Sequence, residues 1–225
     1  MSGIYYENYT LPSVEERQEQ LHHALKMPKE HIDYLYNMNI QPKVVYDLGS
    51  CVLHWAREAK TVWPDADIVL FEAMDEVKSL YEKFGYKKYS LGVVSDIDGK
   101  KVQFYQRLHD PGGNSYYKEN TNFYQEEHAV EKIAMTLDTL VKINQFPLPN
   151  LIKMDIQGAE MDVLKGAKNC LQSCNDVIME LQHVDYNIGA PHRDKVIGYM
   201  DGVGFDLVSN ITLTNVDGDY HFKKR

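Results

Sequence analysis

Acidic side chains follow several short apolar segments of this 225-residue sequence, each at the point where a buried β-strand would end. A carboxylate at such a position loses its hydration unless it meets water, a ligand or a cation, so a group of them indicates a site. Carboxylates accept hydrogen bonds from hydroxyl groups, bind cations and accept protons. The polar residues at these positions are Asp47, Glu72, Ser95, Asp155 and Glu180, with His183 just beyond.

The segment VVYDLGS (residues 44–50) ends in a carboxylate, a glycine and a hydroxyl group, from Asp47, Gly49 and Ser50. Glycine lets a ligand approach the backbone closely. Glu72 stands at the end of the next expected strand, where an acid suits the hydroxyl groups of a ribose. These residues predict a nucleoside-binding site, although Asp-x-Gly alone is equally compatible with a plain turn.

The turn after the first strand distinguishes between two kinds of nucleoside cofactor. A nicotinamide dinucleotide needs a G-x-G-x-x-G turn to seat its pyrophosphate, whereas residues 49–54 read GSCVLH, with one glycine. The Asp47 carboxylate beside this turn would also repel a phosphate. A cofactor with an adenosine and a positive charge but no phosphate fits better, which indicates S-adenosylmethionine.

Short apolar segments alternate with helical patterns after Pro42, which predicts a mostly parallel sheet with helices on both faces. We therefore expect an α/β, Rossmann-like fold with a twisted sheet, and an antiparallel strand or two at its C-terminal edge. One helix is expected over residues 159–171, and Asp98-Gly99 predicts a hairpin between residues 93–94 and 102–105. The expected strands are residues 43–48, 67–71, 89–94, 150–156, 176–181, 205–209 and 220–223.

Residues 1–41 predict a helical extension. Ser13 and Glu16 have the spacing of a capping box, which satisfies the free N–H groups of a first helical turn. The extension could cover the active site or only a sheet edge, and both interpretations stay open. Residues 42–225 contain no repeat and no linker, so we expect one globular domain.

The most specific pattern combines TLD at residues 136–138, LIKMDIQGAE at 151–160 and VLKGA at 163–167. It resembles the FkbM family of methyltransferases, and the similarity covers roughly residues 43–210. The resemblance implies a Rossmann-like fold, S-adenosylmethionine as the methyl donor and usually an O-methyl product on a carbohydrate or natural product. The cofactor contacts expected in this way are Asp47, Gly49, Ser50, Glu72, Ala73, Val94, Ser95 and Asp155.

The chain departs from the family pattern in two places. Leu53 stands where the family has a second glycine, and Cys51 where it has an asparagine-like residue. Gln157 stands where a glutamate is usual, which removes a possible charge from the site. The acids at the strand ends remain, which favours a working enzyme.

Methyl transfer to a hydroxyl group is an in-line displacement, so much of the catalysis can come from holding donor and acceptor in place. The hydroxyl proton must also leave, which requires a base. His183 is the predicted base, because an imidazole with an ordinary pKa of about 6.5 accepts a proton at neutral pH. The predicted catalytic residues are Lys153, Asp155, Glu180 and His183.

Plainer interpretations of these residues stay open. His183 could be a loop histidine bonded to backbone, and Lys153 could form an internal ion pair. Asp155, Glu180 and His183 could instead bind a divalent metal ion that lowers the pKa of the hydroxyl group. No spacing in the sequence requires a metal.

Residues 107–127 form a long polar segment with several aromatic residues. Long loops in compact domains often bind ligands, and aromatic rings stack on sugar rings. We expect Asn114, Tyr116 and Tyr117 to contact the acceptor, which indicates a sugar. A plain surface loop is equally compatible with the segment.

The composition limits the partners. A net charge of −9 disfavours nucleic acid. No apolar stretch approaches the roughly 18–20 residues of a membrane span, and the start lacks the basic region of a signal peptide. We therefore expect a cytoplasmic protein with a small-molecule or glycan acceptor, whose cysteines, Cys51, Cys170 and Cys174, are reduced thiols rather than metal ligands.

Two other functions compete with this prediction. One is a non-catalytic binding module that keeps the methyltransferase-like fold, which the departures at Leu53 and Gln157 favour. The other is a nicotinamide-dependent oxidoreductase, which the missing glycines disfavour.

Overall fold

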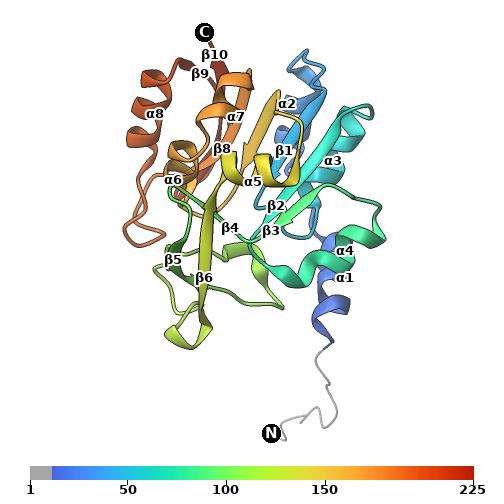
Figure 1. The fold of residues 1–225 in the computed structure, drawn as a ribbon, viewed down its shortest axis with the longest axis vertical. Helices are drawn as coiled ribbons and strands as arrows, with labels where there is room; N and C mark the ends of the chain where they lie inside the picture. The colour runs from blue at the N-terminus through green and yellow to red at the C-terminus, as the bar shows by residue number, and fades with distance from the viewer. Residues whose placement is uncertain (1–11) are drawn as a thin grey trace, which may run out of the picture.

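A seven-stranded, mostly parallel sheet forms the centre of the computed structural model, which describes residues 12–225 (Figure 1). Its strand order is β3-β2-β1-β7-β8-β10-β9. Within this sheet β10 is the one reversed strand and pairs antiparallel with both β8 and β9, as predicted for the C-terminal edge. The strands are β1 (Val44–Leu48), β2 (Asp67–Glu72), β3 (Tyr89–Leu91), β7 (Leu151–Met154), β8 (Asp176–Gln182), β9 (Phe205–Leu213) and β10 (Asp217–Lys224).

Hydrophobic cores cover both faces of this sheet. On what we call the α3 face, helices α1 to α4 pack on side chains such as Leu151 and Ile178. On the α8 face, helices α5 to α8 pack on side chains such as Ile152 and Met179, because successive strand residues point to opposite faces. The helices are α1 (Val14–Ala24), α2 (Lys29–Asn37), α3 (His54–Val62), α4 (Lys78–Lys83), α5 (Leu137–Asn144), α6 (Glu160–Lys165), α7 (Lys168–Ser173) and α8 (Arg193–Gly202), with 3₁₀ turns η1 (Asp75–Val77), η2 (Pro111–Gly113) and η3 (Glu126–His128).

A small sheet of β4 (Val93–Ser95), β6 (Ala129–Thr136) and β5 (Lys100–Tyr105), in that order, lies below the large sheet in the view of Figure 1. The predicted pairing of residues 93–94 with 102–105 is therefore wrong. The turn at Asp98-Gly99 forms, but β4 and β5 each pair with β6, which lies between them. The strand predicted over residues 89–94 divides at Gly92, because β3 belongs to the large sheet and β4 to the small one.

The helix predicted over residues 159–171 is also divided. It consists of α6 and α7, which a short turn at Gly166 and Ala167 separates. The Asp138 carboxylate of α5 accepts hydrogen bonds from the backbone N–H groups of Asn169 and Cys170, and these bonds cap the start of α7.

The N-terminal extension begins with the predicted capping box, in which Ser13 and Glu16 exchange hydrogen bonds. Helix α1 reaches the turn after β1, where the His22 ring lies 2.7 Å from the Val52 carbonyl oxygen. Residues 1–11 of the expected extension lie outside the described residues. Within residues 12–225, no helix combines the length and apolar character that a membrane crossing requires.

Candidate active site

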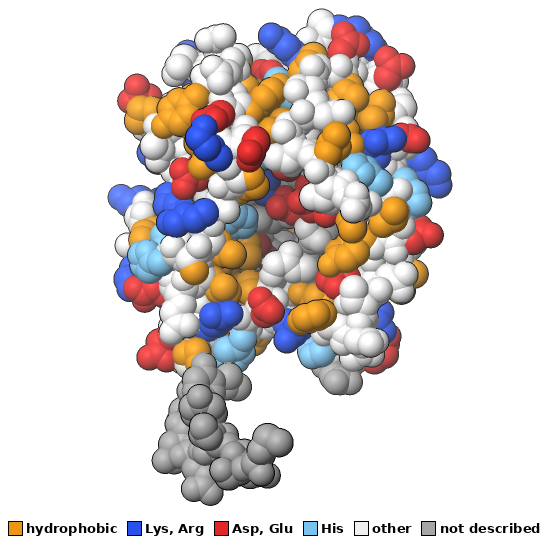
Figure 2. Space-filling model, turned by 180° about the vertical axis from the view of Figure 1, so that it is seen from behind, with side chains coloured by type: hydrophobic (Ala, Val, Ile, Leu, Met, Phe, Trp, Pro, Cys, Tyr) orange, Lys and Arg blue, Asp and Glu red, His pale blue; other side chains and the backbone are white. Residues whose placement is uncertain are grey.

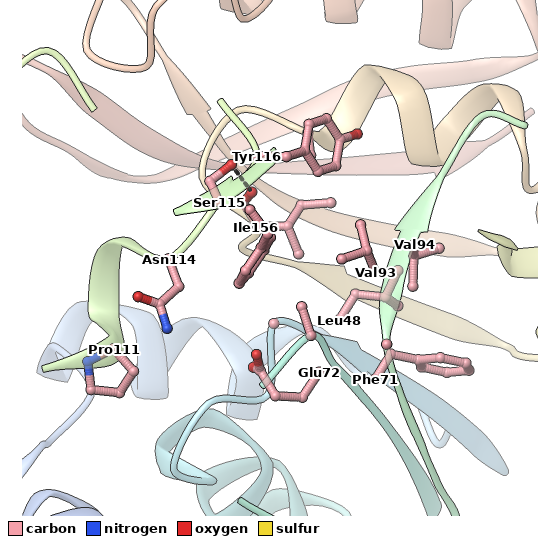
Figure 3. Close-up of a pocket in the computed structure, with 15 residues that line it drawn as sticks. Leu48, Phe71, Glu72, Val93, Val94, Pro111, Asn114, Ser115, Tyr116 and Ile156 are labelled. Atoms are coloured by element: carbon pink, nitrogen blue, oxygen red, sulfur yellow. Dashed lines mark hydrogen bonds between the residues drawn. The ribbon is translucent and has the colours of Figure 1, made fainter. Parts of the chain in front are cut away.

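A pocket with an empty volume of about 510 Å³ lies between the carboxyl ends of β1 and β2 and the small sheet. This space includes open solvent, so the enclosed part of the pocket is smaller. Figure 3 shows Glu72 and Asn114 reaching toward it from different segments of the chain. The lining is otherwise mostly apolar and includes Leu48, Gly49, Phe71, Ala73, Val93, Val94, Phe104, Pro111, Tyr116, Ile156 and Ala159.

Gly49 makes the turn after β1 with a φ of +76°, a conformation that side chains rarely adopt. A Cβ atom at this position would lie 1.9 Å from the carbonyl oxygen of Asp155. The turn after β1 therefore packs directly on the turn after β7, and the pocket adjoins the residues that follow both strands.

The unusual residues of the first turn keep a glycine-like backbone. Cys51 and Leu53 have φ values of +43° and +70°, a conformation that costs roughly 1–2 kcal/mol for a residue with a Cβ atom. Leu53 is fully buried in the core of the α3 face, and burial of a leucine side chain contributes roughly 1.5–3 kcal/mol. The burial offsets the strain, so the turn tolerates leucine.

Glu72 ends β2 with a carboxylate that the backbone holds in place. Its Oε2 atom accepts a hydrogen bond from the Cys51 N–H at 2.8 Å, and its Oε1 atom accepts one from the Met74 N–H at 3.0 Å. Burial raises the pKa of Glu72, and these N–H groups oppose that shift. Each oxygen keeps a second lone pair, so the carboxylate can still accept hydrogen bonds from hydroxyl groups in the pocket.

Asn114 has a fixed amide orientation. Its Oδ1 atom accepts hydrogen bonds from the Arg107 N–H at 2.8 Å and from the Tyr124 hydroxyl at 3.1 Å. Among residues 12–225, its Nδ2 atom has only the Met74 sulfur as a partner, at 3.9 Å. A strong donor therefore faces the same pocket as Glu72, so Asn114 does not form a separate acceptor site.

The predicted aromatic pair divides between two positions. Tyr116 lines the pocket, whereas Tyr117 does not, and both hydroxyl groups donate hydrogen bonds to Asp162 Oδ2, at 3.2 and 3.0 Å. The polar segment around them is built into the fold, because Ser115 pairs with Tyr105 and the Asn187 amide donates a hydrogen bond to the Tyr117 carbonyl.

Two predicted cofactor residues face protein rather than the pocket. The buried Ser50 hydroxyl donates to the Phe71 carbonyl at 3.2 Å and lies 3.0 Å from the Tyr81 hydroxyl. The buried Ser95 hydroxyl donates to Asp96 Oδ1 at 3.0 Å. The pocket wall itself contains Gly49, Glu72, Ala73 and Val94 of the predicted set.

Charged side chains from three neighbouring strands meet on the α3 face, and we call Asp47, Lys153, Asp155 and Glu180 the strand-end group. Asp47 and Lys153 are direct neighbours in the β1–β7 pairing. The Lys153 Nζ atom lies 3.8 Å from Asp47 Oδ1 and 3.3 Å from Asp155 Oδ2. The internal ion pair considered for Lys153 is therefore confirmed. Figure 2 shows acidic side chains gathered around a hollow near the centre of the molecule seen from behind.

Asp47 is fully buried, and neither of its carboxylate oxygens accepts a hydrogen bond from the residues that the structure describes. Burial raises the pKa of Asp47 to about 6, although the Lys153 ammonium lowers it. The Asp47 carboxyl group lies near the carboxyl end of β1, beside the turn at Gly49.

Asp155 and Glu180 have opposite electrostatic environments. Burial would raise the pKa of Asp155, but the Lys153 ammonium and a hydrogen bond from Gln157 lower it. The negative charge of Asp155, together with burial and the nearby carboxylates of Asp217 and Asp219, raises the pKa of Glu180 well above its ordinary value. Asp155 is therefore the ionised member of the pair, and Glu180 is the member that binds a proton more readily.

The structure brings Lys153, Asp155 and Glu180 together, but not His183. Along an extended strand, residues three apart point to opposite faces, and Glu180 faces the α3 side. The His183 Nε2 atom lies 2.6 Å from the hydroxyl of Tyr220, whose side chain is buried in the core of the α8 face. The base predicted at His183 thus lies on the other face of the sheet from the strand-end group.

A family model described as the methyltransferase FkbM domain matches residues 44–207. The chain belongs to the FkbM family of methyltransferases. The match includes every residue of the strand-end group and the turn at Gly49, and it begins after helices α1 and α2.

Two methyltransferases are similar in sequence to this FkbM domain. This chain is 50% identical over 88 residues to the hexuronic acid methyltransferase AglP of Haloferax volcanii. The matched segment makes up 39% of this chain and 34% of that protein. This chain is also 26% identical over 159 residues to Methyltransferase 1 of Beauveria bassiana. The matched segment makes up 60% of this chain and 63% of that protein. The matches span less than two thirds of either relative.

Solved structures confirm the predicted fold class. The FkbM methyltransferase from Methylobacillus flagellatus KT matches with a TM-score of 0.54 at 13% identity, over 90% of this chain and 50% of that chain. An O-methyltransferase family protein from Burkholderia thailandensis matches with a TM-score of 0.52 at 5% identity, over 94% and 59% of the two chains. The FkbM domain is thus a Rossmann-like α/β methyltransferase fold.

The metal alternative needs Asp155, Glu180 and His183 in one place. His183 lies on the other sheet face, and residues 12–225 contain no group of three or more His, Cys, Asp or Glu side chains arranged to hold a metal ion. Cys51, Cys170 and Cys174 of the FkbM domain are buried and form no disulfide.

Glu160 is a buried acid of the FkbM domain that the sequence did not assign to the site. Its Oε1 atom accepts hydrogen bonds from the N–H groups of Ile156 and Gly158, at 3.1 and 3.3 Å. These bonds hold the turn between β7 and α6. Glu160 ends the LIKMDIQGAE pattern, but the spacing of the residues does not predict the shape of this turn, so the sequence did not indicate the role of Glu160.

We expect Glu160→Gln to stabilise the protein at high pH. Burial raises the pKa of Glu160 to about 7 from 4.5, so its contribution to stability is present below pH 4.5 and is lost as the pH rises through about 7. Glutamine can keep both bonds to Oε1 without a buried charge. The variant should gain roughly 1–3 kcal/mol of unfolding free energy at pH 8, and little at pH 4. Urea denaturation at both values tests this, and an equal effect at both would contradict it.

Proposed function

We propose that this chain transfers the methyl group of S-adenosylmethionine to a hydroxyl group of a sugar. The observation that carries the proposal is the pair of carboxyl groups with opposed pKa shifts, Asp155 and Glu180, close to a largely apolar pocket that contains Glu72. Opposed shifts in neighbouring acids are typical of sites that divide an electrostatic role from a proton-accepting role. The name of the relative from Haloferax volcanii, a hexuronic acid methyltransferase, supports a sugar acceptor.

The pocket residues fit S-adenosylmethionine. Glu72 can accept hydrogen bonds from the ribose hydroxyls, and Asn114 Nδ2 offers a donor to the adenine. The apolar walls suit the face of the base, and the turn at Gly49 has no room for a side chain. When bound, the cofactor supplies a methyl group on a positively charged sulfur, and the strand-end carboxylates suit positive charge.

Glu180 is the proposed proton acceptor. Bound S-adenosylmethionine would supply the methyl group, whose bond to sulfur would break and leave a neutral thioether as the sugar oxygen takes the methyl group. The Glu180 carboxylate would accept the hydroxyl proton, so that the ether product is neutral. Asp155 does not compete for this proton, because the Lys153 ammonium favours its ionised form. A base whose pKa is raised toward the working pH accepts a proton more effectively than an ordinary carboxylate.

Mass spectrometry with an isotopically labelled methyl donor tests the proposed acceptor class. A panel of neutral sugars, hexuronic acids and nucleotide sugars should yield at least one labelled O-methyl product. If the protein binds the cofactor but labels no sugar in the panel, the sugar is wrong. If it binds no cofactor in calorimetry, the non-catalytic binding module explains the fold instead. The net charge of −9 supports leaving nucleic acids out of the proposed acceptors.

We expect Glu72→Ala to weaken S-adenosylmethionine binding by roughly 1.5–3 kcal/mol, the range for a hydrogen bond to a charged group. Isothermal titration calorimetry measures the affinity, and thermal denaturation checks that the variant is folded. Ser50→Ala is the matched control, because the buried Ser50 hydroxyl contacts the Phe71 carbonyl and the Tyr81 hydroxyl and does not line the pocket. Equal losses in the two variants would contradict the assignment of Glu72 to the ribose.

A further inference from the structure

The side chain of Gln157 joins the two acids of the proposed proton-transfer site. Its Nε2 atom donates hydrogen bonds to Asp155 Oδ1 at 2.8 Å and to Glu180 Oε1 at 2.9 Å. An amide nitrogen carries two hydrogens, so both are used by the two carboxylates. The amide is the bridge that lets these like charges lie close together.

The backbone around Gln157 holds this bridge in place. Gln157 has a φ of +53°, in the left-handed region, and Gly158 follows with +95°. A Cβ atom on Gly158 would lie 2.6 Å from the Cβ atom of Ala190. The hydrogen bonds from Ile156 and Gly158 to Glu160 fix the turn on both sides. A strained residue persists where the surroundings determine its conformation, and such residues cluster at functional sites.

The charges around the bridge favour a cation. Asp219 is the direct neighbour of Glu180 in the β8–β10 pairing, and Asp217 lies two residues further along β10. Lys153 is already shared between Asp47 and Asp155, and the ring of His31 lies 3.1 Å from Asp219 Oδ2. Two carboxylates within reach of one atom are the usual ligands of Mg²⁺ or Mn²⁺. Here that atom is a nitrogen that presents hydrogens, which repels a cation.

We propose that the Gln157 amide takes the place of a divalent cation between Asp155 and Glu180, so that this chain transfers methyl groups without a metal ion. Gln157 is then a positioning residue. It holds one Glu180 oxygen toward Asp155 and leaves the other for the acceptor hydroxyl. The positioning of Glu180 for catalysis rests on the proposed function. The replacement of a cation by the Gln157 amide does not depend on it.

Calorimetric titration with Mn²⁺ tests the exchange without any activity measurement. The wild type should show no binding at this site, and Gln157→Glu should gain Mn²⁺ binding because a third carboxylate replaces the amide. The double variant Gln157→Glu/Glu180→Gln should lose the binding again. Mn²⁺ binding by the wild type that disappears in Glu180→Gln would overturn the proposal. So would a folded Gln157→Glu variant that binds no Mn²⁺.

A second variant tests the positioning role. Gln157→Leu removes the hydrogen bond to ionised Glu180, so the rise of kcat with pH should move upward by about one pH unit. A chelator should leave wild-type turnover unchanged. A pH profile of kcat that does not shift in the variant, or wild-type turnover that needs added metal, would overturn the role. If Glu180→Gln keeps native turnover while the Mn²⁺ results hold, only the proposed function fails.

Discussion

Replacement of Glu180 by glutamine should lower kcat by roughly 10²–10⁴, the usual contribution of a positioned base. The amide cannot take the hydroxyl proton, but it keeps the size of the side chain. The affinity for S-adenosylmethionine should stay nearly unchanged, because Glu180 does not line the pocket that contains Glu72 and Asn114. Single-turnover kinetics with saturating cofactor, together with a calorimetric titration, would measure both effects.

His183→Ala is the matched control for this experiment. His183 was the base predicted from the sequence, and its ring lies on the α8 face beside Tyr220. We expect the variant to keep most of its turnover. The reverse result, with native turnover in Glu180→Gln and a large loss in His183→Ala, would return the base to His183 and contradict our assignment. The wild-type rate should also rise with pH through the raised pKa of Glu180.

Lys153→Met should destabilise the fold by roughly 3–5 kcal/mol, the range for breaking a buried ion pair by removing one partner. Lys153 is 2% exposed and is shared between Asp47 and Asp155. Chemical denaturation at neutral pH would measure the loss. An unchanged unfolding free energy would show that the ion pair contributes nothing to stability.

The pH dependence of Lys153→Met follows from Asp47. The folded pKa of Asp47 is raised from 3.8 to about 6, so its contribution to stability is present below pH 3.8 and is lost as the pH rises through about 6. Without Lys153 the charged form is even less favourable. The variant should therefore lose more stability at pH 8 than at pH 5, and the second substitution Asp47→Asn should recover part of it.

The large sheet could be predicted from the sequence because its central strands are buried on both faces. Such strands appear as continuous apolar runs, as in residues 43–48 and 67–71. Strand β6 was missed because most of its residues are partly or fully exposed, so AVEKIAMT has no such run. Without β6 the turn at Gly99 was interpreted as a simple hairpin.

The site was predictable to the level of strand ends, and no further. Parallel strands bring their carboxyl ends to one edge, which is why Asp47, Asp155 and Glu180 lie together. The facing of each side chain depends on register, and a shift of one residue moves a side chain to the other face. His183 follows Glu180 by three residues, so its side chain points to the opposite face of the sheet and does not reach the site. The role of Gln157 depends on its left-handed backbone conformation. The sequence showed only that glutamine replaces the usual glutamate there, and this does not predict the backbone conformation.

The position of β10 affects how the chain folds during translation. β10 lies between β8 and β9, so β9 pairs with the large sheet only through a strand that is translated after it. Until residues 217–224 leave the ribosome, the edge of β8 is unpaired and β9 carries apolar side chains such as Leu207 and Leu213 with no partner strand. Unpaired edges of this kind invite aggregation. Nascent chains that stall before residue 217 should therefore depend most on chaperones, although every residue of the strand-end group has already been made.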